Sequence, residues 1–165
     1  MARTAAKILD VLRRFESFVA ATAYLVTALL LMGDILGREL LGEGIYGAQK
    51  MAVYAAIVAG FIGLSLATDA GIHLRPAFLD TVFPDEYDRA VWRVADLVSC
   101  AIYLTLGVIA VQFVIGTYEA SDRAAVLYWL LWPIQCVIPY ALFTTATRHG
   151  IYAAYPALRP KSEAS

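Results

Sequence analysis

The sequence predicts an all-α membrane protein with four transmembrane helices, and three observations support this fold class. First, 61% of the 165 residues are hydrophobic and 16% are charged, with a mean hydropathy of +0.66, whereas a soluble domain carries about 25% charged residues. Second, four uncharged runs are long enough to cross a bilayer. Third, the basic residues gather at alternate ends of these runs. The net charge of -1 and the lack of a dense basic cluster give no reason to expect nucleic-acid binding.

The four uncharged runs each predict one crossing. They cover residues 17–33, 51–68, 97–118 and 124–147, which are 17, 18, 22 and 24 residues long. A transmembrane helix needs about 20 apolar residues, within a range of about 17 to 25. We therefore expect spans near 16–36, 48–68, 97–118 and 124–147. Only residues 119–123 separate the last two, so these two predict an antiparallel hairpin.

Two amphipathic segments lie beside the spans. Residues 1–15 combine basic residues with an apolar face, which is typical of a helix along the membrane surface. A cleaved signal peptide is disfavoured because the apolar run after them is long and no A-x-A-like site follows it. Residues 85–96 also have one apolar face. They predict either a surface helix or the protruding start of the third span.

The second run carries small residues at helical spacing on one face. Such rows let another helix approach closely, and this close packing drives helix association in lipid. We expect this face to pack against a larger partner, although frequent alanine in the whole chain offers a generic explanation. The residues are Ala52, Ala55, Ala56, Ala59, Gly60, Gly63 and Ala67.

The distribution of basic residues predicts that both termini are cytoplasmic. Ten lie in the N-terminal segment, the loop 69–96 and the tail 148–165, and only Arg38, Lys50 and Arg123 lie on the other side. The positive-inside rule then places the loop 69–96 and a partly disordered tail in the cytoplasm. Basic and aromatic residues near the ends of the runs are expected to anchor lipid headgroups or a partner. They are Arg13, Arg14, His73, Arg75, Trp92, Trp129, Trp132 and Arg148.

The runs contain no Asp, Glu, Lys, Arg or His, whereas proton relays and many ion-coupled transporters place such groups within the membrane. Gln112 and Gln135 are expected to hydrogen-bond neighbouring helices. The fourth run also contains Pro133 and Pro139, which predict a kink.

The sequence offers little for a cofactor, a metal or an enzyme. His73 and His149 could suggest haem, but both follow the apolar runs rather than facing each other within them. Cys100 and Cys136 are predicted to differ in depth by about 10 Å, too far for a disulfide, and are expected to be packing residues. We found no zinc-ligand spacing or catalytic motif in a supporting context, so we expect neither a cofactor nor catalysis.

The order of several short motifs resembles the small membrane (Q) subunit of tripartite ATP-independent periplasmic (TRAP) transporters over nearly the whole chain. The residues that carry the resemblance are Asp34, Gly37 and Arg38; Gly47, Ala48 and Gln49; Gly71, His73, Arg75, Leu79 and Pro84; and Trp132, Ile138 and Pro139. The chain departs from the family where Gln49 replaces the usual Glu. It also has Pro76 and Ala77 where an acidic residue usually follows the His-x-Arg turn.

The resemblance implies a non-catalytic subunit in the bacterial cytoplasmic membrane. Its partners would be a large sodium-coupled elevator subunit, which it braces as a scaffold, and a periplasmic protein that binds an organic acid. We expect the exposed outer charges to lie near the docking surface of that binding protein. They are Arg38, Glu39, Glu43, Glu119, Asp122 and Arg123. Two other classes stay open: a membrane anchor of a respiratory cytochrome-type complex, and a small four-helix exporter.

Overall fold

Two helical hairpins make up the computed structural model of this chain, which describes residues 2–70 and 88–160. The first hairpin pairs α1 (Ala2–Leu41) with α2 (Ala48–Asp69). The second pairs α4 (Asp88–Glu119) with the short α5 (Trp132–Gln135) and with α6 (Val137–Ala154), and a 3-10 turn, η2 (Pro156–Leu158), follows. Within the described ranges the fold is all-helical, with one isolated β-bridge between Arg123 and Leu130.

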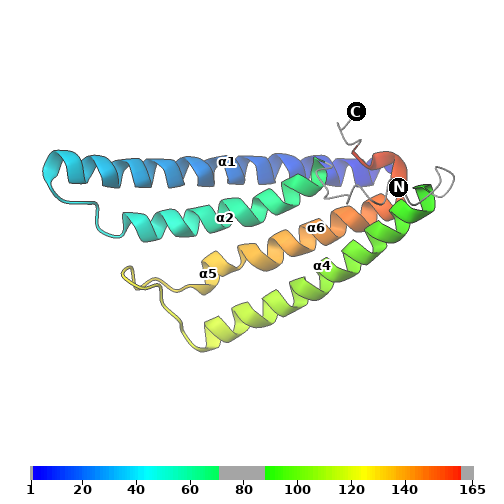
Figure 1. Ribbon diagram of the computed structural model, residues 1–165. Helices are drawn as coiled ribbons and strands as arrows, with labels where there is room; N and C mark the ends of the chain where they lie inside the picture. The colour runs from blue at the N-terminus through cyan, green and yellow to red at the C-terminus, as the bar shows by residue number, and fades with distance from the viewer. Residues whose placement is uncertain (1, 71–87, 161–165) are drawn as a thin grey trace.

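The hairpins pack on each other mainly through α2 and α6, while α1 touches α6 only slightly. Figure 1 shows the two interhelical connections, residues 42–47 and 120–131, at one end of the molecule, which we call the loop end. The start of α1 and the end of α6 lie at the opposite end, the terminal end. Near the terminal end α4 and α6 lie side by side, and toward the loop end α4 diverges from α6 and α5.

Three of the described helices, α1, α2 and α4, are long and apolar enough to cross a membrane. The first of them is one continuous helix of 40 residues, about 60 Å long at 1.5 Å per residue. Residues 2–15 are therefore its first turns rather than a separate element. Likewise, residues 88–96 are the start of α4, which favours the second of the two alternatives for that segment. Residues 85–87 lie outside the described part.

The predicted fourth span, 124–147, does not begin as a helix. Residues 124–131 form a folded loop, and helical structure begins at Trp132, where α5 runs to Gln135 and α6 follows after Cys136 up to Ala154. Pro133 lies in the first turn of α5, where a missing N–H costs no helical hydrogen bond. Within the loop, Val126 and Tyr128 adopt positive φ angles of 77° and 56°, which a right-handed α-helix does not allow. A fourth crossing by α5 and α6 stays a prediction.

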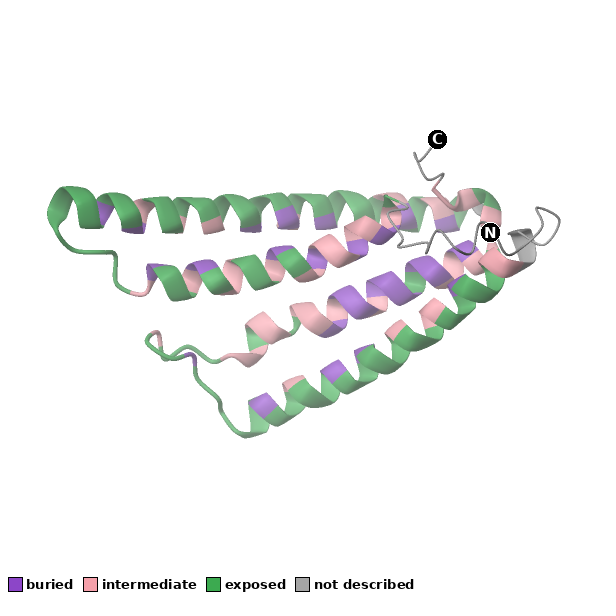
Figure 2. Ribbon diagram, viewed as in Figure 1, coloured by how far each residue is buried: buried purple, intermediate pink, exposed green. Residues whose placement is uncertain are grey.

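The buried side chains concentrate on α6, as Figure 2 shows by its nearly continuous purple stretch. The outward faces of α1 and α4 are instead covered by exposed large apolar residues along most of their length. Examples are Phe18, Leu25, Ile35, Ile102 and Phe113. Such surfaces suit contact with lipid or with another membrane protein rather than with water.

Candidate functional site

A buried ion-pair network centred on Arg148 joins α1, α2 and α6. Arg148 and Glu16 are both fully buried, and the guanidinium Nη2 lies 2.6 Å from Glu16 Oε2. Its Nη1 donates a short hydrogen bond to Asp69, and its Nε donates to Ser65 Oγ at 3.2 Å. The rigid, planar guanidinium can serve three partners in fixed directions, which a lysine could not do.

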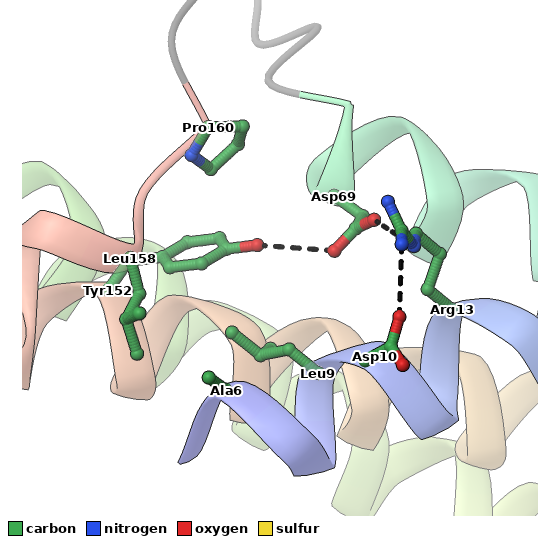
Figure 3. A pocket seen from close by; sticks show the side chains of 8 residues that line it. All are labelled: Ala6, Leu9, Asp10, Arg13, Asp69, Tyr152, Leu158 and Pro160. Carbon is green, nitrogen blue, oxygen red and sulfur yellow. Dashed lines mark hydrogen bonds and ion pairs between the residues drawn. The ribbon is translucent and has the colours of Figure 1, made fainter. Parts of the chain in front are cut away.

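Three hydroxyl groups complete this Arg148 network. Ser65 donates to Glu16 Oε1 at 3.0 Å, and its oxygen also lies 3.0 Å from Thr144 Oγ1. The Tyr152 hydroxyl donates to Asp69 at 3.5 Å (Figure 3). Ser65 and Asp69 are four residues apart on α2, and Thr144, Arg148 and Tyr152 follow the same spacing on α6. Helical periodicity therefore places each set on one face, where the two faces meet.

The Arg148 network ties the first hairpin to the second. Glu16, Ser65 and Asp69 come from α1 and α2, whereas Thr144, Arg148 and Tyr152 come from α6. Removing one partner of a buried ion pair leaves an uncompensated charge, which costs about 3–5 kcal/mol. Any relative movement of the hairpins that separated Arg148 from Glu16 would incur a cost of this kind.

A second polar cluster connects α4 with the end of α6. His149 Nδ1 lies 3.0 Å from Asp96 Oδ1, and Arg159 Nη1 donates to Asp96 Oδ2 at 3.2 Å. The Tyr103 ring stacks on the imidazole with centroids 5.6 Å apart, and Arg159 lies over Trp92 at 3.7 Å. Trp92, predicted as an interface anchor, thus holds the segment after α6 against α4. The other histidine considered for haem, His73, lies outside the described residues.

A third cluster lies at the loop end and brings together residues of the family motif. The Asp34 carboxylate is only 3% exposed as a residue, and it accepts from Arg38 Nη2 at 2.9 Å and from Gln49 Nε2 at 3.1 Å. The neutral amide of Gln49 can donate to this carboxylate. A glutamate there, usual in the family that the sequence resembles, could donate only if protonated. Gly37, also in the motif, packs closely on the backbone of Glu43.

The loop end also carries the charges predicted to dock a partner, and the structure leaves them exposed. Glu39 and Glu43 lie at the end of α1 and in the following connection, and Glu119 ends α4. Asp122 and Arg123 lie in the loop 120–131, where Arg123 Nη1 donates to the Tyr128 carbonyl at 3.0 Å. Their role in docking stays a prediction.

The small residues of α2 divide between two faces. Ala52 and Ala59 are buried by the chain's own helices, whereas Ala56 and Gly60 are exposed and Ala55, Gly63 and Ala67 are half-buried. A Cβ added at Gly60 or Gly63 would meet no atom within 4 Å. Only part of the predicted packing face is therefore free for another protein.

The predicted interface anchors have different surroundings. Arg13 and Arg14 both pair with Asp10 at 3.0 Å, and Trp129 is exposed in the loop 120–131. Trp132 packs edge-on against Tyr118. Arg148, assigned to the same group, is instead fully buried because Glu16 and Asp69 supply its counter-charges inside the protein.

Other predicted residues are placed as follows. Pro139 is buried in the first turn of α6, and Arg75 lies outside the described residues. Gln112 is exposed on α4, and the buried Gln135 Oε1 has no hydrogen-bond partner among the described residues. Both cysteines are free thiols.

Comparison with known proteins agrees with the family resemblance of the sequence. The family model for tripartite ATP-independent periplasmic transporters, DctQ component, matches residues 27–158. The ectoine TRAP transporter small permease protein TeaB of Halomonas elongata is 21% identical over 136 residues, which cover 82% of this chain and 70% of TeaB. No solved structure matches the chain. The family match includes Asp69 and Arg148 but begins after their partner Glu16.

Proposed function

The chain belongs to the DctQ component family of TRAP transporters, and from this premise we propose that it is a static brace for the large membrane subunit. It is a small transporter subunit and not an enzyme. The observation that best supports a bracing role is the Arg148 network, because it holds the two hairpins together through the fully buried ion pair of Arg148 and Glu16. A subunit that carries no substrate gains from a fixed shape.

The surface for the large subunit would include the exposed part of the small-residue face on α2. Ala56 and Gly60 are exposed there, and nothing in the described structure lies where a Cβ of Gly60 would be. A helix of the large subunit could therefore approach this part of α2 closely, as membrane helices do at small residues. The apolar outward sides of α1 and α4 would face lipid or the same partner.

We infer the remaining features of the proposed complex from the TRAP transporter family. With both termini in the bacterial cytoplasm, the loop end would face the periplasm. Its charged residues, Arg38, Glu39, Glu43, Glu119, Asp122 and Arg123, would then lie near a docked substrate-binding protein. Sodium ions and an organic acid substrate would be bound by the partners in an elevator-type uptake cycle, and this chain would bind neither. The intramembrane runs lack charged residues, which supports this division of tasks.

Reconstitution tests this proposal directly. Liposomes would contain this chain alone, the large subunit alone, or both, with the binding protein, substrate and a sodium gradient supplied outside. We expect uptake only when both membrane subunits are present. Uptake by this chain alone, or full uptake by the large subunit without it, would contradict a bracing role.

A further inference from the structure

A polar cavity of about 270 Å³ opens beside the Arg148 network at the terminal end. Figure 3 shows its lining, with Asp10 and Arg13 from α1, Asp69 from the end of α2 and Tyr152 from α6. Leu9 and other apolar residues cover the rest of its wall. The cavity therefore presents acidic, basic and apolar groups within one small volume.

The charged groups of the cavity leave a hydrogen-bond acceptor available. Asp69 Oδ1 is held by Arg148 and Tyr152. Asp69 Oδ2 has only Arg13 Nε nearby, at 4.0 Å, which is too long for a hydrogen bond. Arg13 itself is directed to Asp10 at 3.0 Å, and its side chain is 57% exposed. Among the described residues, Asp69 Oδ2 therefore accepts no hydrogen bond.

The cavity lies where the protein surface changes from apolar to charged. On α1, the exposed side chains of Val11, Phe15 and Phe18 precede a long apolar surface toward the loop end. Arg13 and Arg14 lie among the first of these residues. This position corresponds to the headgroup level of a membrane in either orientation of the chain. A lipid headgroup in the cavity could place its acyl chains along the apolar side of α1.

Hydrogen-bond chemistry selects among headgroups, because the lining carboxylates already have arginine partners. Asp69 pairs with Arg148, and Asp10 pairs with Arg13 and Arg14. The open acceptor, Asp69 Oδ2, would form a stronger hydrogen bond with an ammonium group than with the neutral hydroxyl of a glycerol headgroup. A choline group carries no N–H and could not donate to Asp69. We propose that this cavity binds the headgroup of a phosphatidylethanolamine-type lipid, with the primary ammonium at Asp69 and Asp10 and the phosphodiester at Arg13. This proposal does not depend on the transporter assignment.

Lipid binding to the purified full-length chain tests the proposal. Native mass spectrometry would compare phosphatidylethanolamine, phosphatidylcholine and phosphatidylglycerol with identical acyl chains. We expect phosphatidylethanolamine to bind at least about fivefold more tightly than the other two, the ratio expected for about 1 kcal/mol from a retained hydrogen bond. Equal or weaker binding of phosphatidylethanolamine would overturn the proposal. Equal competition by deacylated glycerophosphoethanolamine would also do so, because the site would then bind a soluble amine.

Two substitutions test the ammonium contact and the phosphodiester contact separately, and neither replaces a residue of the Arg148 network. Asp10→Asn should reduce the preference for ethanolamine over choline, because it removes one ammonium partner. Arg13→Gln should weaken both zwitterionic lipids, because it removes the phosphate partner. Lys7→Gln, an equal loss of positive charge at an exposed position of α1 outside the cavity, should change neither. A preference that survives Asp10→Asn unchanged, or that Lys7→Gln reduces as much, would refute the site.

Discussion

Arg148 on α6 and Glu16 on α1, 132 residues apart, form an ion pair of 2.6 Å in which neither side chain is exposed. The pair connects the beginning of the first hairpin to the end of the second. Asp69 brings the end of α2 to the same guanidinium. Three helices therefore share one cation, and its loss affects contacts of all three.

Replacing Arg148 by Gln should lower the free energy of unfolding by about 3–5 kcal/mol, because Glu16 would stay buried without a counter-charge. Denaturation in detergent, followed by circular dichroism, measures this change. Arg14→Gln is the matched control, since its ion pair with Asp10 is 77% exposed on the arginine side, and it should cost about 0–1 kcal/mol.

The double replacement Glu16→Leu with Arg148→Met tests whether the cost arises from the unpaired charge. Apolar residues of similar size often replace a buried ion pair at little cost. The double variant should therefore be more stable than Arg148→Gln. If it were less stable, the hydrogen bond that Glu16 accepts from Ser65, which only the double variant lacks, would contribute more than the unpaired charge costs.

Gln49→Glu should destabilise the loop end more than Gln49→Leu does. Both changes remove the donor to Asp34, but the glutamate also places a second carboxylate beside a buried one. We expect the free energy of unfolding to be about 1 kcal/mol lower for Gln49→Glu than for Gln49→Leu, a difference comparable with the contribution of one hydrogen bond. Thermal unfolding of the two variants at neutral pH gives the comparison, and equal melting temperatures would show that Arg38 or solvent compensates the added charge.

Gly60→Leu should leave the isolated chain folded but weaken its complex with the large subunit. The added side chain meets nothing within 4 Å in this chain, yet it would obstruct a helix packed on α2. Gly116→Leu on α4 is the control, because Gly116 is also exposed and without near neighbours. Co-purification with the large subunit is the measurement. Recovery of the Gly60→Leu variant at the level of the unchanged chain would remove the exposed face of α2 from the proposed interface.

Gly47→Ala and Gly42→Ala form a pair that separates backbone strain from a steric clash. Both glycines have a positive φ, 75° and 76°, so each alanine should cost about 1 kcal/mol. Only at Gly47 would the Cβ also lie 2.6 Å from a side-chain atom of Leu127. The Gly47 variant should therefore melt at the lower temperature in a thermal scan, and the reverse order would contradict the close contact of the two connections.

The sequence predicted the first three spans because long uncharged runs leave a helix little alternative in a membrane. For the fourth span, hydropathy gave no reason to expect the helix to start later than residue 124. Residues 124–131 are as apolar as a span, but the structure folds them into a loop with internal hydrogen bonds such as Ala124 N to Trp129 O, 2.7 Å. The position of Pro133 at the start of α5 is the local signal that a helix begins there.

The Arg148 network was not predicted because the runs were defined by the absence of charge. Glu16, Asp69 and Arg148 each directly adjoin one of these runs, so hydropathy places them in water or among headgroups. A charge at the end of one run gives no information about a charge at the end of another. The four-residue spacing of Ser65 and Asp69, and of Thr144, Arg148 and Tyr152, is the signal that could have indicated facing polar surfaces.

Ionic contacts at a single depth also determine how helices can slide. Two apolar helix surfaces offer similar packing after a shift of one turn, about 5.4 Å, whereas Arg148 would lose both carboxylates in such a shift. The longitudinal register of α1 and α2 against α6 is thus fixed at one point near the terminal end. A force applied to one hairpin would be transmitted to the other as a displacement of the whole subunit.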